Sequence, residues 1–204
     1  MSALIVIAKA PVAGRSKTRL VPPCTPAQAA QLAEAALADT LETVARSGAG
    51  RRVLALEGAP GDWLPDGFEV VSQRGDGLAE RLAAAFDDTG ERAFLVGMDT
   101  PQLTVAQLDA ALAHPCSYGA AEDGGWWGLG LPAPDARVFA GIPMSADDTG
   151  ARQLDRLRAL DYAPVLLETL RDVDTIEDAG AVAAGAPGGR FATTLGALGL
   201  APRA

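Results

Sequence analysis

Short apolar runs alternate with segments of helical periodicity between residue 4 and about residue 123. Runs such as residues 4–7 and 93–96 are too short for buried helices, which need about ten to twelve residues. They have the length and the continuous apolar character of strands that are covered on both faces. This alternation therefore predicts an α/β domain with a mainly parallel sheet, and few other folds are compatible with it.

The boundaries of the expected elements follow from the same pattern. Capping residues mark two helix starts, since Thr25 precedes Pro26 and Gln28, and Thr104 precedes Gln107. We expect residues 1–204 to form one domain, with the Gly-, Pro- and Ala-rich end from residue 185 packed loosely. Strands are predicted at residues 4–7, 52–56, 68–71, 93–96, 117–121 and 163–167, with a further apolar run at 126–131, and helices from residues 25, 78, 104, 149 and 175.

The charge and the hydropathy pattern exclude several classes of protein. A formal net charge of −9 argues against a broad nucleic-acid interface, which needs a basic face, but it is compatible with a small anionic ligand. No apolar run approaches the roughly 20 residues of a membrane span, and the apolar start is interpreted as core rather than as a signal peptide. Two cysteines, Cys24 and Cys116, are too few for a disulfide framework. We therefore expect a cytoplasmic protein without a membrane span and without a nucleic-acid duplex as partner.

Asp99 follows directly after the predicted strand at residues 93–96. Pro101 has no N–H group to donate, so the ladder of the strand must end before it. In open α/β sheets, ligands bind at the carboxyl ends of the strands. A lone carboxylate at this position is therefore a candidate functional group, although a turn Asp before a helix would show the same pattern.

A basic loop follows the first predicted strand. Lys9, Arg15, Lys17 and Arg19 lie within eleven positions, and Gly14 permits close approach of a ligand to the backbone. The loop is a candidate anion cradle, and we expect Lys17 and Arg19 on a solvated edge. It is not a P-loop, because the required glycines are missing although a Lys-Thr pair is present. A solvated basic loop without a ligand is the alternative interpretation.

The segment Glu122 to Pro132 combines a Gly124-Gly125 turn with two adjacent tryptophans. In a strand, Trp126 and Trp127 point to opposite faces, so one is expected in the core and the other beside a cleft. Two core tryptophans are the alternative interpretation. Farther upstream, Arg81 either points at the site or pairs with Glu80 or Asp87.

A cationic loop and carboxylates at one sheet edge suit a nucleotide held through its phosphates with a divalent cation. Mg²⁺ and Mn²⁺ take oxygen ligands, typically one or two carboxylates together with substrate phosphates. We expect Asp99 to bind this metal, with Asp123 or Asp148 completing the site. Ser-His-Asp and Cys-His catalysis are not expected, because the single histidine, His114, lies beside a helix end.

Five motifs occur in a fixed order along the chain. They are KAPVAGRSKTRL (9–20), Gln73 to Arg81, GMDTPQL (97–103), EDGGWWGLGL (122–131) and DVDTIEDA (172–179). Together they resemble the DUF2064 family, which belongs to the GT-A superfamily of nucleotide-diphospho-sugar transferases. The resemblance implies a three-layer α/β/α, Rossmann-like fold, phosphate contacts by Lys17 and Arg19, and a metal on Asp99. The chain departs from the family pattern at Gly97, where Asp-x-Asp would place a second carboxylate, and at Trp126-Trp127, where Tyr-type aromatics are usual.

Three functions compete on this evidence. A glycosyltransferase would take a nucleotide sugar and an unknown small-molecule acceptor. A nucleotidyltransferase would take an NTP and release pyrophosphate, and the first loop also resembles those of the enzymes of molybdopterin and F420 cofactor synthesis. A nucleotide-binding protein without catalysis is the third. The expected site comprises Asp99 and Asp123 for catalysis, Asp99 and Asp148 for the metal, and Lys9, Gly14, Lys17, Arg19, Gln73, Arg81, Gly124, Gly125 and Trp126 for the nucleotide.

Overall fold

The computed structural model describes residues 2–144 and 146–200. Its strands are β1 (Ala3–Lys9), β2 (Arg51–Glu57), β3 (Glu69–Ser72), β4 (Ala93–Val96), β5 (Ser117–Ala120), β6 (Trp126–Leu131) and β7 (Val165–Leu166). They form one seven-stranded sheet in the order β3-β2-β1-β4-β6-β5-β7. Only β6 runs antiparallel to its neighbours β4 and β5, so the predicted mainly parallel sheet is confirmed.

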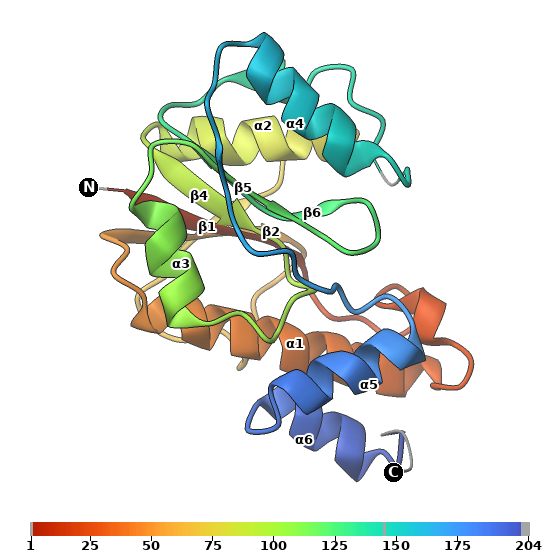
Figure 1. Cartoon of the computed structure of the whole chain (residues 1–204). Helices are drawn as coiled ribbons and strands as arrows, with labels where there is room; N and C mark the ends of the chain where they lie inside the picture. Colours follow the sequence, from red (N-terminus) through yellow and green to blue (C-terminus); the bar gives the residue numbers. More distant parts are fainter. Residues whose placement is uncertain (1, 145, 201–204) are drawn as a thin grey trace.

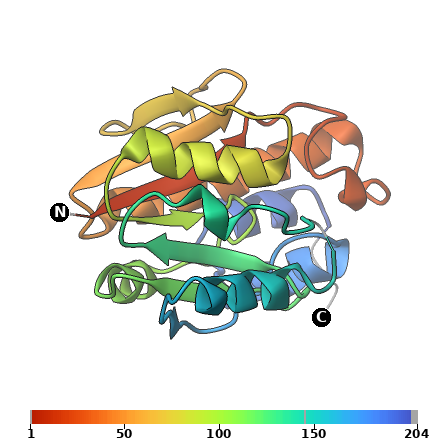
Figure 2. The ribbon, with the colours of Figure 1, turned by 90° about the horizontal axis from the view of Figure 1, so that it is seen from above.

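Helices cover both faces of the sheet (Figure 1). They are α1 (Pro26–Arg46), α2 (Leu78–Thr89), α3 (Val105–Leu112), α4 (Thr149–Ala159), α5 (Ile176–Gly185) and α6 (Arg190–Ala197), with short 3₁₀ turns η1 (Thr18–Leu20) and η2 (Ala136–Val138). Figure 1 shows α2 and α4 on one side of the sheet and α1 and α3 on the other, and Figure 2 shows α2 and α4 from above. The fold is therefore a three-layer α/β/α arrangement. None of the helices within residues 2–144 and 146–200 is long and apolar enough to serve as a membrane span.

The continuous apolar runs are buried because both faces of their strands are covered. On β4, Leu95 packs with the α2 side of the core, while its neighbours Phe94 and Val96 pack with the α1 side. Successive side chains of a strand point to opposite faces, so an unbroken apolar run is what a doubly covered strand requires. The predicted capping boxes of α1 and α3 are also present.

The C-terminal part packs against the outer side of α1 and is not loosely packed. Helices α5 and α6 lie beyond α1 (Figure 1), and Phe191 and Leu195 of α6 are buried against it. The carboxylate of Asp39 accepts hydrogen bonds from the backbone N–H groups of Arg190 and Phe191 at 2.9 and 2.8 Å. The expectation of loose packing is wrong for residues 186–200, because an apolar pair at i, i+4 and a cap from α1 fix this helix.

The direction of the strands brings three loops to one edge. Strands β1, β4 and β5 end at this edge, and β6 begins there because it runs in the opposite direction. Val96 pairs with Gly128 and Ala120 with Trp126, so the segment 122–125 lies close to the end of β4. Residues 9–19, 97–101 and 122–125 therefore converge, as the sequence predicted.

Candidate functional site

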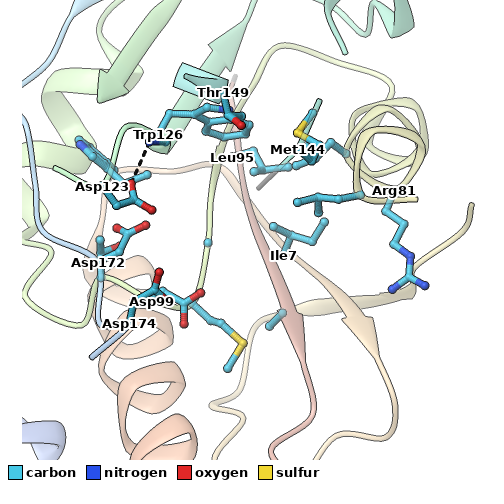
Figure 3. Close-up of a pocket in the computed structure, with 18 of the residues that line it drawn as sticks. Ile7, Arg81, Leu95, Asp99, Asp123, Trp126, Met144, Thr149, Asp172 and Asp174 are labelled. Atoms are coloured by element: carbon cyan, nitrogen blue, oxygen red, sulfur yellow. Dashed lines mark hydrogen bonds between the residues drawn. The ribbon is translucent and has the colours of Figure 1, made fainter. Parts of the chain in front are cut away.

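A cavity of about 880 Å³ opens at the edge where these loops meet (Figure 3). Its walls come from the ends of β1 and β4, the start of β6 and the first turns of α2, and they also include Met144, Ala146, Asp147, Thr149, Asp172 and Asp174. Figure 3 shows the carboxylates of four aspartates on one side of the cavity and Arg81 on the opposite side. We call the side with Asp99, Asp123, Asp172 and Asp174 the acidic end.

Backbone pairing of a distant segment completes the acidic end. The N–H group of Val173 donates to the carbonyl of Asp99 at 2.9 Å, and the N–H group of Glu122 donates to the carbonyl of Leu170 at 2.9 Å. These bonds hold residues 170–174, which we call the strap, between the loops that follow β4 and β5. The strap carries Asp172 and Asp174 into the cavity, where both side chains line the wall.

Asp172 is the most strongly perturbed carboxyl group of the site. Its Oδ1 atom is buried and has no hydrogen-bond partner within the described residues. Burial raises the pKa of this carboxyl to about 7, and the negative charges of Asp99 and Asp123 add to the shift. Asp172 therefore changes its protonation state near neutral pH, which is typical of a carboxyl group in a functional site.

Lys17 joins three segments at the acidic end. Its Nζ atom donates to Oδ1 of Asp99 at 2.5 Å and to the carbonyl of Val173 at 2.6 Å, and its side chain is only 6% exposed. Its backbone lies in the left-handed region at φ 46°, which non-glycine residues seldom adopt. The expected solvated position is wrong for Lys17, because the side chain turns inward to satisfy Asp99 and the strap. Arg19 is 67% exposed, as expected, and pairs with Asp174 at 2.6 Å.

At the other side of the cavity, the wall residues Lys9 and Arg81 share the carboxylate of Glu57 with Arg15. Arg15 and Glu57 lie behind the wall, and we call this cluster the basic end. Glu57 pairs with Lys9 at 3.5 Å and with Arg15 at 3.6 Å, and it accepts a short hydrogen bond from Arg81. The hydrogen bond from Arg81 is the largest cause that lowers the pKa of Glu57, and Lys9 adds to it. Arg81 and Lys9 line the cavity, and Arg81 pairs with Glu57 rather than with Glu80 or Asp87.

Gln73 and Gly14, two further residues that were predicted to contact the nucleotide, differ in their position relative to the cavity. The side-chain amide of Gln73 lines the cavity and donates to the carbonyls of Ala8 and Ala55 at 2.7 and 3.0 Å, so it fixes the ends of β1 and β2. Gly14 is not part of the cavity wall, although its positive φ of 77° shows why glycine suits this turn. The loop therefore contributes to the cavity through its first residue and Arg19 rather than through its glycine.

The Gly124-Gly125 turn packs against the start of α4. Gly124 has φ 88°, and a Cβ atom at this position would lie 1.9 Å from the carbonyl oxygen of Asp147. The N–H group of Gly150 donates to the carbonyl of Gly124 at 2.8 Å. Only glycine allows this approach, so the turn holds Asp123 at the cavity, where its Oδ1 atom accepts a hydrogen bond from Gly125.

The two tryptophans separate as predicted. Trp127 is 2% exposed, lies edge-on to Phe94 and donates from its indole nitrogen to the carbonyl of Glu168 at 3.0 Å. Trp126 is half-buried and lines the cavity (Figure 3). Both tryptophans therefore contribute to the cavity wall, and Trp127 is in addition fully part of the core.

Asp148 does not reach the cavity, so its prediction as a metal ligand is wrong. It stands at the N-cap of α4, and its carboxylate accepts a hydrogen bond from Arg152, one helical turn later, at 2.7 Å. The strap supplies the carboxylates that Asp148 was expected to supply. The motif DVDTIEDA indicated this segment, but nothing in the sequence showed that Asp172 would lie beside Asp99.

The carboxylates of the acidic end suit a divalent cation that is shared with a ligand. Within the described residues, no group of three His, Cys, Asp or Glu side chains is arranged to hold a metal ion. Mg²⁺, however, usually takes only one or two carboxylates, with waters and phosphates as further ligands. The unpartnered Oδ1 atom of Asp172 and the half-exposed carboxylate of Asp99 fit this requirement.

Comparisons with known proteins give a family and a fold. A family model described as "Uncharacterized protein conserved in bacteria (DUF2064)" matches residues 29–146. A protein from Desulfovibrio desulfuricans G20, provisionally described as a nucleotide-diphospho-sugar transferase, is 25% identical and has a TM-score of 0.86 over 98% of this chain and 96% of that chain. No curated protein matches.

Two less similar structures show the fold alone. CMP:2-keto-3-deoxy-manno-octonic acid synthetase, solved with CTP, is 14% identical and has a TM-score of 0.55 over 90% of this chain and 98% of that chain. Rv0371c from Mycobacterium tuberculosis H37Rv is 21% identical and has a TM-score of 0.52 over 86% of this chain and 94% of that chain. Together with the sheet order, these likenesses confirm the predicted Rossmann-like α/β fold.

Proposed function

Since the chain belongs to the DUF2064 family, as its motifs predicted, we propose that it is a metal-dependent transferase that takes a nucleotide-activated donor, a nucleotide sugar. In this proposal residues 1–204 act as one nucleotide-diphospho-sugar transferase-like domain. The observation that carries the proposal is the division of one cavity into a basic end and an acidic end with an unpartnered buried oxygen of Asp172. The description of the Desulfovibrio protein supports the same class.

The chain's own residues would orient the donor between the two ends. Lys9 and Arg81 attract negative charge, so the phosphates lie between the basic end and Asp99. Asp99 and Asp172 would hold the Mg²⁺ or Mn²⁺ ion, which supplies charge stabilisation for the leaving diphosphate. The apolar side chains of the wall, among them Trp126, exclude water from the reacting atoms.

Transfer then needs an acceptor hydroxyl and a group that takes its proton. In our proposal the acceptor oxygen forms a bond to the anomeric carbon of the donor while the bond from that carbon to the phosphate oxygen breaks. The electron pair of the broken bond leaves with the nucleoside diphosphate. Asp123, at the cavity wall beside Trp126, accepts the proton of the hydroxyl as general base.

A nucleotidyltransferase is the second candidate, and the basic end favours it. Lys9, Arg15 and Arg81 meet at one carboxylate, and a triphosphate engages more cations than a diphosphate sugar does. In that reaction the acceptor oxygen attacks the α-phosphorus of an NTP, and the broken P–O bond releases pyrophosphate. The released product therefore distinguishes the two candidates.

Titration calorimetry of nucleotides with and without metal, followed by product analysis, tests the proposal. We expect millimolar Mg²⁺ or Mn²⁺ to strengthen binding of a nucleoside diphosphate, because Asp99 and the phosphates share the cation. Asp99→Asn should lose most of this effect, and turnover should fall by about 10²–10³-fold, the loss typical of removing one charge-stabilising group. A panel of nucleotide sugars and NTPs is then scored separately for nucleoside diphosphate and pyrophosphate release.

Asp148→Asn is the matched control. It also removes a single carboxylate, but one that pairs with Arg152 outside the cavity. We expect native metal dependence and native turnover in this variant. Native binding that ignores metal, or the same loss in both variants, would contradict the assignment of Asp99. Metal-dependent binding without any product would favour the non-catalytic alternative.

A further inference from the structure

The cavity extends beyond the proposed donor position to a wall around Trp126. Trp126 is half-buried, and Met144 and Thr149 lie beside it (Figure 3). Asp123 and Asp147 both line the cavity, and the backbone carbonyl of Asp147 lies against Gly124, the residue that follows Asp123. The hydrogen bond from Gly150 to the Gly124 carbonyl ties the two segments that carry these side chains, so they form one fixed surface.

The charge of this surface is not compensated. Within residues 2–144 and 146–200, neither Asp123 nor Asp147 has a Lys, Arg or His partner within 4.0 Å. The cations that line the cavity are engaged elsewhere, since Lys9 and Arg81 pair with Glu57 and Arg19 pairs with Asp174. A divalent cation on Asp99 and Asp172 would neutralise those two carboxylates and leave Asp123 and Asp147 unpaired.

Unpartnered polar atoms show independently that the cavity is built for a polar ligand. Thr100 is 1% exposed and lines the cavity, and its hydroxyl oxygen has no hydrogen-bond partner within the described residues. The buried Oδ1 atom of Asp172 lacks a partner as well. Buried polar groups without a partner are costly in a native protein, and a ligand that supplies hydrogen bonds is one common reason for them.

We propose that the surface formed by Asp123, Trp126 and Asp147 is an acceptor subsite for a ligand that carries hydroxyl or amino groups and no phosphate. Carboxylates accept hydrogen bonds from such groups, and an indole face packs against C–H groups or a cation. A phosphomonoester would instead bring about two negative charges towards two unpaired carboxylates. The inference rests on the proposed function for the place of the donor, and it favours glycosyl transfer over transfer to a phosphate group.

The test is a fluorescence titration with matched sugars that differ only in a phosphate group. Glucose and glucose 6-phosphate form one pair, and glucosamine and glucosamine 6-phosphate the other. Each is titrated against the full chain and against Trp126→Phe, and the difference between the two signals reports on Trp126. We expect both unphosphorylated sugars to bind at least about tenfold more tightly than their phosphates, because only the phosphates face like charge.

Variants of the two carboxylates localise the effect. Asp123→Asn and Asp147→Asn should each reduce the preference against the phosphates severalfold and weaken the binding of glucosamine. Asp148→Asn, the neighbouring carboxylate outside the cavity, should leave both affinities unchanged. Glucose 6-phosphate that binds at Trp126 as tightly as glucose overturns the proposal, and so does the absence of any Trp126 signal with all four sugars.

The titration needs no nucleotide, metal or turnover, so its failure is distinct from failure of the proposed function. If the preference for unphosphorylated sugars is absent but nucleotide binding depends on metal, the acceptor subsite is contradicted and the proposed donor site is supported. Sugar binding at Trp126 without any nucleotide binding would support the subsite and remove the donor part of the proposed function.

Discussion

The basic end and the acidic end of the cavity differ in the ratio of cations to carboxylates. At the basic end, Lys9, Arg15 and Arg81 all lie on the single carboxylate of Glu57. At the acidic end, four aspartates face only two cations, each engaged with one of them. Positive charge is therefore in excess at one end and negative charge at the other. A ligand that fits both ends must therefore have its negative charge at one end only, with its phosphates towards the cations around Glu57.

The two cations at the acidic end, Lys17 and Arg19, differ in burial, and a pair of substitutions tests this difference. Lys17→Met should leave Asp99 without its cation and the Val173 carbonyl without its donor. Breaking a buried pair costs about 3–5 kcal/mol, and because Asp99 is half-exposed we expect about 2 kcal/mol of lost unfolding free energy. For a chain of this length that lowers the Tm by roughly 4–8 °C.

Arg19→Met is the matched comparison at the exposed partner of Asp174. Surface ion pairs contribute at most about 1 kcal/mol, so this variant should unfold close to the native temperature. Thermal unfolding of both variants by circular dichroism gives the answer. Equal, small changes would mean that Lys17 does not hold the strap and that the acidic end is less fixed than its contacts indicate.

The parts of the fold and site that the sequence predicted depend on local patterns. Continuous apolar runs predicted the doubly covered strands β1 and β4, since such runs need no knowledge of their partners. The period of a strand predicted that Trp126 and Trp127 would separate. The edge at which Asp99 lies followed from the direction of parallel strands.

The missed features depend on contacts between residues far apart in sequence. Lys17 and Val173 are separated by 156 positions, and no local pattern indicates their hydrogen bond. Asp148 was selected because it stands in an acidic loop, but the start of α4 turns its carboxylate to Arg152. Glu57 was overlooked because a carboxylate at the end of a strand has no distinctive pattern until the cations around it are known.

Glu57→Gln tests whether the basic end is restrained by its own carboxylate. Removing this charge frees Lys9 and Arg81 from their partner and leaves the basic end more positive. We expect pyrophosphate to bind about tenfold more tightly, which corresponds to roughly 1.4 kcal/mol, and the gain to shrink as salt increases. Calorimetry at two salt concentrations measures both effects.

Glu69→Gln is the control for that experiment, because Glu69 pairs with Arg51 away from the cavity. Its affinity for pyrophosphate should be native. Weaker binding in the Glu57 variant would show that Glu57 orients the cations for the ligand and does not compete with it. Glu57 would then be part of the ligand site, and the basic end could no longer be described by its cations alone.

Asp172 gives the acidic end a dependence on pH, and the sign follows from its raised pKa. The folded protein holds this proton up to about pH 7, whereas an unfolded chain releases it near the ordinary value of 3.8. Stability is therefore lost as the pH rises between these values, and the cost is complete above pH 7. Asp172→Asn removes the cost, so it should raise the Tm at pH 8 and have little effect near pH 4.

The expected gain is modest, because the chain relaxes around a buried charge. One pKa unit corresponds to about 1.4 kcal/mol, and even a third of the shift would raise the Tm at pH 8 by roughly 3–6 °C. With saturating Mn²⁺ and a nucleoside diphosphate, the native protein should have a higher Tm than Asp172→Asn, since only the native carboxylate gains a cation partner. Thermal scans at pH 4 and pH 8, with and without these ligands, measure both effects, and Asp148→Asn should follow the native protein throughout. A variant that is less stable than the native protein at pH 8 without ligands would show that the carboxylate is stabilised by the cavity, and the acidic end would then carry no unsatisfied charge for a ligand to neutralise.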